Sequence, residues 1–204
     1  MKFILGTKQH MTQVFTEDGV AHPATIVSAG PVVVTQLKNA EKDGYQAAQV
    51  GYGLRRKKNI NKAQQGHTKD LGDFRYMREF RTEDGEEKKV GDKIDVSAFE
   101  VGDTIVVSSI SKGKGFQGVV KRHGFHGGPR SHGQKHSERE PGSIGATGPQ
   151  RVFKGTKMGG RTGGNRVTVK NLEILQVDKD ENQLVIKGAI PGKRGTLVEI
   201  RTVT

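Results

Sequence analysis

Three groups of residues in this sequence have types and spacings that could support chemistry, and all lie between residues 113 and 143. The first is GKGFQG at 113–118, which has the Gly-x-Gly-x-x-Gly spacing of loops that hold the pyrophosphate of a dinucleotide. The second is Ser143 with His136 and Glu138, which offers a nucleophile, a base and an orienting carboxylate. The third is a set of closely spaced histidines that could share a metal ion, namely His123, His126, His132 and His136.

The context of GKGFQG argues against a cofactor loop. A strand expected at 104–109 (TIVVSS) precedes it, but the fingerprint also needs a helix that begins at the loop and a βαβ unit of about 30 residues. The residues that follow, VVKRHGFHGGPRSHG, contain glycines and Pro129, which exclude a long helix. Glu138 lies at about the right distance for a ribose ligand, yet without the helix its position means little. We therefore expect no nucleotide cofactor.

The metal and nucleophile interpretations are also weak. The chain has no cysteine, no aspartate lies near the histidines, and their neighbours are cationic, so these rings suit bases or phosphates better than a metal. Ser143 lies in PGSIG, which lacks the first glycine of the G-x-S-x-G elbow. The sequence predicts no metal, no cofactor, no small-molecule substrate and no catalytic residue, and therefore no enzyme.

The positive charge of the chain is concentrated in residues 111–166, which we call the extension. It holds twelve Lys and Arg against two acidic residues, a net charge of +10, whereas the whole chain carries +12. It also holds 15 of the 29 glycines and few large apolar side chains. Ordering a backbone costs about 1–2 kcal/mol per residue, and this composition offers too little burial in return. Because a solubilising surface would mix charge signs, we expect an irregular segment that binds a polyanion and does not fold alone.

The composition favours nucleic acid over a membrane as that polyanion. The sequence pI is about 9.9, which is typical of nucleic-acid-binding domains. No apolar run approaches the roughly 18 residues of a spanning helix, no basic amphipathic helix is evident, and the apolar run at residues 3–5 is too short for a signal peptide. The absence of cysteine agrees with a cytoplasmic protein. We expect no membrane partner.

The residues on either side of the extension form short β-rich runs separated by turn signals. Such runs occur at 11–19, 24–37, 45–53 and 104–109, and three more lie in 166–203 with breaks at 178–182 and 191–195. They predict a mainly β protein, a small closed barrel or sandwich into which the extension is inserted. The predicted organisation is barrel strands in 1–110, the extension in 111–166 and barrel-completing strands in 167–204. A second basic insertion is expected near 54–80, where 74–80 is a short helix or strand.

The candidate RNA-binding residues are mostly the cations of these two segments. Lys and Arg would neutralise phosphates, and glycine would let the backbone approach closely. No groove-reading helix is evident, which favours folded RNA over duplex DNA. In the insertion the candidates are Arg55, Arg56, Lys57 and Lys58. In the extension they are Lys112, Lys114, Lys121, Arg122, His123, Arg130, His132, Lys135, Arg139, Ser143, Arg151, Lys154, Lys157, Arg161 and Arg166.

Several ordered motifs resemble one known family. They are SKGKGFQGVVKR (111–122), SHG (131–133), PGSIG (141–145), RVFKGTKMGGRTG (151–163) and RVTVKNLEI (166–174), preceded by ILGTK, MTQVFTEDG, GPVVVTQLK and DGYQAAQVGYG. Together they cover essentially the full chain and resemble the bacterial form of the third protein of the large ribosomal subunit. The resemblance implies a six-stranded closed barrel, similar to the second domain of translation elongation factors, and an extension that reaches through ribosomal RNA towards the peptidyl-transferase centre. It also implies an early-assembly, non-catalytic protein whose partners are large-subunit ribosomal RNA and neighbouring large-subunit ribosomal proteins.

By motif, the cations at 112–122 match the root of the family's extension and residues 142–151 match its tip. His10 stands where the family usually has glycine in a K-x-G-M-T turn, which predicts a reshaped turn. Glu138 and Glu140 flank Arg139, which weakens the local positive charge, and no glutamine aligns with the one that some relatives methylate after GSIG.

Two other functions stay open on the residues alone. One is a nucleotide-dependent enzyme that uses GKGFQG and Ser143, for which micromolar nucleotide would raise the thermal stability in a saturable way. The other is a non-ribosomal binder of DNA or RNA, which competition between duplex DNA and structured ribosomal RNA would reveal.

Overall fold

The computed structural model describes residues 1–69, 71–82 and 88–203, and the chain divides into two compact units. One unit contains Met1–Ile110 and Arg166–Thr204, and the other is Ser111–Asn165. The described secondary structure consists mainly of strands, which confirms the predicted mainly β fold. Among the described residues, no helix has the length and apolar character needed to cross a membrane.

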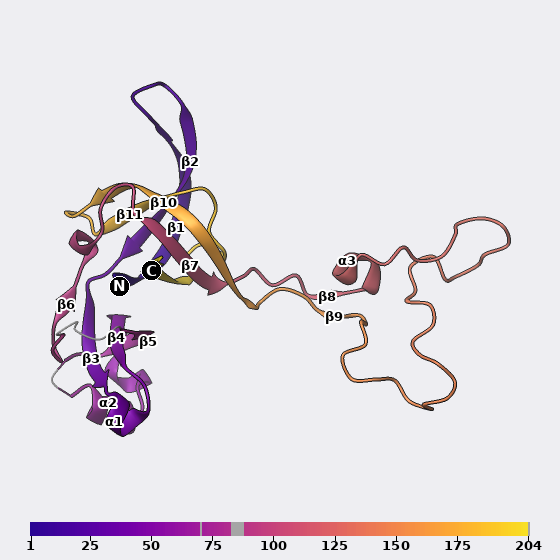
Figure 1. Ribbon diagram of the computed structural model, residues 1–204, viewed down its shortest axis with the longest axis horizontal. Coiled ribbons are helices and arrows are strands. Elements are labelled where there is room, and N and C mark those ends of the chain that lie inside the picture. The colour runs from indigo at the N-terminus through magenta and orange to yellow at the C-terminus, as the bar shows by residue number, and fades with distance from the viewer. Residues whose placement is uncertain (70, 83–87, 204) are drawn as a thin grey trace. The chain divides into compact units, whose positions relative to one another are not determined.

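Six antiparallel strands of the first unit close into a ring, in the order β1-β12-β7-β10-β11-β2 (Figure 1). Side chains on the strands alternate between the two faces, so that Ile105 and Val107 of β7, like Leu184 and Ile186 of β11, are fully buried. The ring strands are β1 (Phe3–Phe15), β2 (Ala21–Ala29), β7 (Thr104–Ile110), β10 (Arg166–Asp178), β11 (Gln183–Lys187) and β12 (Leu197–Thr202).

A second sheet of the first unit has the strand order β5-β4-β3-β6. Its strands are β3 (Val32–Lys38), β4 (Ala47–Leu54), β5 (Phe74–Arg81) and β6 (Lys93–Ile94). The assignment of every strand before residue 110 to one barrel is therefore wrong, because β3 and β4 pair with each other outside the ring. Residues 74–80, predicted as a helix or a strand, belong to strand β5, which places them in this sheet rather than in a loop.

The ring and the second sheet share one hydrophobic core. The Phe3 ring of β1 stacks on Phe80 of β5, with 4.5 Å between the ring centroids. The hydroxyl of Tyr52 on β4 donates to the carbonyl of Ser28 on β2 at 3.0 Å, and it also lies 3.0 Å from the Thr7 hydroxyl of β1. These contacts join the two sheets into a single unit.

Short elements connect the strands of the first unit. They are α1 (Ala40–Asp43), the 3₁₀ turns η1 (Lys57–Asn59) and η2 (Val96–Ala98), and α2 (Lys62–His67). Asn61 caps α2, since its side chain accepts a hydrogen bond from the Gln64 amide at 2.7 Å.

The turn predicted at His10 is wrong. His10 lies inside β1, where the pairing with β2 shifts register between Lys8 and Met11. A β-bulge places an extra residue in one strand without reversing the chain. His10 is not among the residues with positive φ, so glycine is not required there.

The second unit has three short elements, β8 (Phe116–Gln117), α3 (Val119–His123) and β9 (Gly160–Arg161). The strands β8 and β9 pair with each other in an antiparallel ladder (Figure 1). The sequence predicted an irregular segment, and the structure adds these three short elements near its two ends.

Candidate nucleic-acid interface

The two ends of the second unit run antiparallel and form its root, which we define as residues 111–118 and 159–165. The Ser111 amide donates to the Asn165 carbonyl at 2.9 Å. The Lys114 amide donates to the Thr162 carbonyl at 2.8 Å, and the Thr162 amide donates to the Gly115 carbonyl at 2.9 Å. GKGFQG thus forms one side of a two-stranded ladder.

The helix α3 follows this ladder and is a single turn. Gly124 ends it in the left-handed conformation, with a φ of 73°, and the Gly124 amide donates to the Val120 carbonyl at 3.0 Å. A dinucleotide fingerprint would continue into a full helix and a parallel strand. Here β7 and β10, the strands on either side of the unit, pair in an antiparallel manner.

Two candidate RNA-binding residues on α3 contact the opposite side of the second unit. The Arg122 guanidinium donates through Nη1 to the Met158 carbonyl at 2.8 Å, and His123 Nε2 lies 3.0 Å from the same oxygen. Because a carbonyl only accepts, Nε2 of His123 must carry a proton. Gly160 leaves space for the guanidinium, since a Cβ there would lie 2.5 Å from Arg122 Nη1. These two side chains form what we call the α3 clip, which sequence reasoning did not foresee.

The other candidates of the second unit are exposed to solvent, and most extend over its irregular part rather than meeting in one cleft. One cavity brings Lys157 close to His123. The exposed candidates are Lys112, Lys114, Lys121, Arg130, His132, Lys135, Arg139, Ser143, Arg151, Lys154, Lys157 and Arg161.

The carboxylate and hydroxyl of the suspected triad have other partners. Glu138 accepts a hydrogen bond from Arg130 Nε at 2.6 Å, and this bond raises the pKa of the Arg130 guanidinium, which keeps its charge. The Ser143 hydroxyl donates to the Gly145 carbonyl at 3.0 Å. Within the described ranges, no three His, Cys, Asp or Glu side chains are arranged to hold a metal ion.

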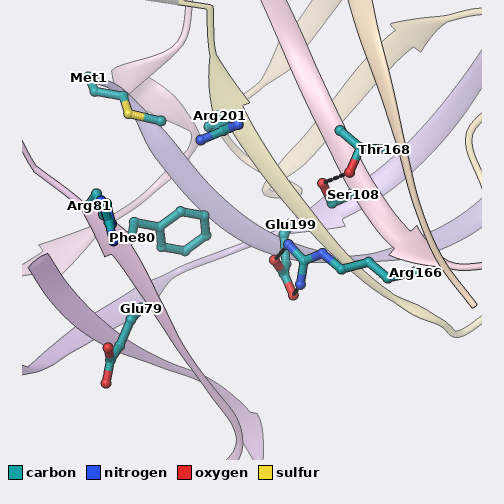
Figure 2. Close-up of a pocket in the computed structure, with 9 residues that line it drawn as sticks. All are labelled: Met1, Glu79, Phe80, Arg81, Ser108, Arg166, Thr168, Glu199 and Arg201. Atoms are coloured by element: carbon teal, nitrogen blue, oxygen red, sulfur yellow. Dashed lines mark hydrogen bonds and ion pairs between the residues drawn. The ribbon is translucent and has the colours of Figure 1, made fainter.

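Arg166 belongs to β10 and lines a cavity of ≈ 360 Å³ in the first unit. Figure 2 shows its guanidinium beside the Glu199 carboxylate, which accepts a hydrogen bond from Arg166 Nη1 at 3.0 Å. The same carboxylate accepts one from Arg78 Nε at 3.0 Å. Two further cations, Arg81 and Arg201, line this cavity. Sequence reasoning missed Arg78, Arg81 and Arg201 because nothing in their local sequence reveals that β5, β10 and β12 lie together.

The four cations of the predicted insertion, Arg55 to Lys58, are exposed in the first unit. They follow β4, and Lys57 and Lys58 begin the turn η1. The Gln65 amide group fixes this turn by donating to the Lys57 carbonyl at 3.0 Å and to the Ile60 carbonyl at 2.7 Å. The chain therefore displays this basic run on an ordered turn.

Carboxylates with a shifted pKa hold local structure in the first unit. The Glu100 amide, with help from Lys2, lowers the pKa of Asp103. A hydrogen bond from Lys187 lowers the pKa of Glu173. Neither carboxylate lies beside a candidate nucleophile, so the arrangement suits binding of a polyanion by exposed cations better than acid–base chemistry.

A mainly β body that carries a glycine-rich, strongly basic unit is typical of a ribosomal protein, and comparison with known proteins identifies the family. The family model for ribosomal protein L3 matches residues 53–185. The chain therefore belongs to the ribosomal protein L3 family, which confirms the resemblance found in the sequence.

Relatives match over nearly the whole chain. The large ribosomal subunit protein uL3 of Carboxydothermus hydrogenoformans is 51% identical over 202 residues, which cover 98% of this chain and 96% of the relative. The protein of the same name from Pelotomaculum thermopropionicum is 48% identical with the same coverage. That from Heliobacterium modesticaldum is 50% identical over 97% of this chain and 95% of the relative.

Proposed function

We propose that this protein is a structural constituent of the large ribosomal subunit. In this proposal it binds large-subunit ribosomal RNA, aids early assembly, and directs residues 111–165 through the RNA towards the peptidyl-transferase centre. It acts in the cytoplasm, contacts neighbouring ribosomal proteins and catalyses no reaction. Family membership and the names of the relatives support the ribosomal part of the proposal.

The observation that carries the proposal is the exposure of the basic charge in the second unit. All eleven Lys and Arg side chains of residues 111–165 are exposed, and with the two acidic residues they give this unit +9 of the chain's net charge of +12. Such a surface repels itself in the free protein and is stabilised when phosphates neutralise it. Binding to a folded polyanion is the function that this arrangement serves best.

We further propose a division of labour along the chain. The ring of six strands is the barrel of the elongation-factor type, residues 111–165 are the RNA-threading part, and 167–204 complete the barrel. The exposed cations of the second unit bind phosphates, and Arg55 to Lys58 supply a second contact. Arg122 and Arg166 contribute charge, but the contacts of Arg122, His123 and Arg166 support mainly a positioning role, because each side chain already has a protein partner.

Salt dependence tests this function directly. The affinity of the full chain for a large-subunit ribosomal RNA transcript is measured over a series of monovalent salt concentrations. If about eight phosphates are engaged, the slope of log affinity against log salt is roughly −6 with the single-strand coefficient. A flat response, or equal affinity for duplex DNA, would refute the proposal.

A charge-matched pair of variants locates the binding surface. Replacing Lys135, Arg139, Arg151 and Lys154 by glutamine removes four exposed cations of the second unit, so the slope should become shallower by about 3. The control replaces four exposed lysines of the first unit by glutamine, namely Lys42, Lys89, Lys170 and Lys179. The control should keep the wild-type slope, and both variants should keep the strand signal in circular dichroism. Equal loss in both variants would contradict the assignment.

A further inference from the structure

A cavity of ≈ 550 Å³ lies wholly within the second unit. Its lining begins at the end of α3 with residues 123–128 and also includes Ser137, residues 140–142 and Lys157. This volume is within the usual range of small-molecule sites. Its lining combines aromatic side chains, a cation and glycine backbone.

Two sets of contacts build the cavity. The Gly128 amide donates to the Glu138 carbonyl at 3.0 Å, and a Cβ at Gly127 would lie only 2.0 Å from that carbonyl oxygen. The backbone at 127–128 can therefore approach residue 138 only because residue 127 is glycine. On the other side, the hydrogen bond between His123 and the Met158 carbonyl holds the neighbouring Lys157 at the cavity.

The lining has the chemistry of a nucleotide site. The Phe125 ring is half-buried and lies 6.1 Å from the His123 ring, with 46° between their planes, while the His126 ring is exposed. Unstacked bases of RNA are recognised by stacking on such aromatic side chains. Lys157 supplies a cation for a phosphate, whereas the Glu140 carboxylate only accepts hydrogen bonds and so suits an amino or imino group of a base.

We propose that this cavity takes one unstacked nucleotide of the ribosomal RNA. Its base stacks on Phe125 and His126, and its phosphate lies at Lys157. The inference rests on the proposed RNA-binding function and adds to it a specific ligand, a single extruded nucleotide. It predicts that the second unit recognises RNA at one point by shape and stacking, in addition to the diffuse phosphate contacts.

The experiment uses the full chain and a large-subunit ribosomal RNA transcript. Phe125→Leu removes the aromatic face, and Phe153→Leu is its matched control, because Phe153 is an aromatic residue of the same unit that does not line the cavity. Lys157→Gln and Lys154→Gln form a second matched pair, since only Lys157 lines the cavity. Affinity is measured together with the reactivity of every base towards modifying reagents in the complex.

Loss of one base–aromatic stack weakens binding by roughly 5- to 150-fold, so we expect Phe125→Leu to bind about tenfold more weakly than Phe153→Leu. Lys157→Gln should bind severalfold more weakly than Lys154→Gln. The same nucleotide should become reactive in both cavity variants and stay protected in both controls. Lys157 is exposed, so its replacement should leave the fold intact. The lysine pair therefore decides the question if Phe125→Leu alters the cavity walls.

Three negative results are distinguishable. If the cavity variants match their controls in affinity and in base reactivity while the wild type binds with a steep salt dependence, the nucleotide site is refuted and the proposed function stands. If the two cavity variants expose different nucleotides, the single-nucleotide site is likewise refuted. If the wild type does not bind the transcript at all, the proposed function itself fails.

Discussion

Replacing Gly163 by alanine tests whether the root of the second unit forms as the structure describes. Gly163 has a φ of 75°, which costs an alanine roughly 1 kcal/mol. A Cβ at this position would also lie 2.2 Å from the Lys112 carbonyl oxygen, a backbone atom that moves only if the two sides of the ladder separate. Separation removes the two hydrogen bonds between Thr162 and residues 114 and 115, each worth about 1 kcal/mol. The variant should destabilise the root by about 3 kcal/mol.

The neighbouring glycine provides a matched control. Gly164 has a φ of 70°, but the nearest atom to a Cβ there is Nη2 of the flexible Arg161 side chain, at 3.5 Å. Gly164→Ala should therefore cost only the backbone strain, roughly 1 kcal/mol. The difference of about 2 kcal/mol corresponds to about a 30-fold ratio in the opening equilibrium of the root.

Amide hydrogen exchange of the free protein measures that ratio. The Lys114 and Thr162 amides donate across the ladder, so both should be protected in the wild type. Protection should fall up to about 30-fold further in Gly163→Ala than in Gly164→Ala, and the affinity for ribosomal RNA should follow the same order. Equal effects of the two substitutions would refute the steric argument. Wild-type amides that exchange as fast as those of an open loop would show that the root does not form before RNA binds.

Three further substitutions probe the rest of the chain. Glu199→Gln should lower the free energy of unfolding by about 1–2 kcal/mol, because this carboxylate is only 12% exposed and binds two arginines. The control Glu100→Gln, at a side chain that is 81% exposed, should change the free energy of unfolding by less than about 0.5 kcal/mol. Urea titration of the two variants and the wild type measures both changes. The pKa of Asp103 is lower in the folded state, so its stabilisation is present above the unfolded value near 3.9 and is lost as pH falls through the folded one. Asp103→Asn should therefore be less stable than the wild type at pH 7 but lose less stability than the wild type on acidification. A difference in stability between variant and wild type that is the same at pH 7 and pH 3, measured by urea titration, would contradict this. Arg122→Lys keeps the charge but loses the α3 clip, so it should weaken RNA affinity severalfold without changing the salt slope, whereas Lys121→Arg should change neither.

Local sequence patterns predicted where strands occur better than they predicted which strands pair with each other. The β-branched residues of TIVVSS identify a strand, because such side chains are enriched in strands. The pairing of β7 with β12 and β10 depends on contacts between residues about 55 to 100 positions apart, which no local pattern encodes. For the same reason the sequence could not separate β3 and β4 from the ring. The bulge at His10 depends on register, which is set by the partner strand.

The exposure of the candidate cations could be predicted from the sequence, but their contacts with the protein could not. The charge asymmetry identifies the exposed cations of the second unit without any structure, because exposure is the usual state of a cation in a segment with little apolar material. The role of Arg122 could not be deduced, since Met158, whose carbonyl it contacts, lies 36 positions away. Arg166 looked like the end of a basic run, yet its partner Glu199 belongs to another strand of the ring. A count of charges therefore overestimates the number of side chains that are free to bind phosphate.

The root ladder and the α3 clip determine how much of the second unit would still have to become ordered when RNA binds. The root ladder and α3 bring residues 111–124 and 158–165 together through backbone hydrogen bonds and the Met158 carbonyl, and these contacts need no phosphate. Between them, residues 125–157 have few backbone hydrogen bonds of their own. The ordering entropy at binding should therefore fall mainly on residues 125–157, where most of the free cations lie. If the chain has the proposed function, a root that forms before binding would shorten the segment that RNA must order and would fix the direction of that segment. This would lower the cost of association without adding a single contact.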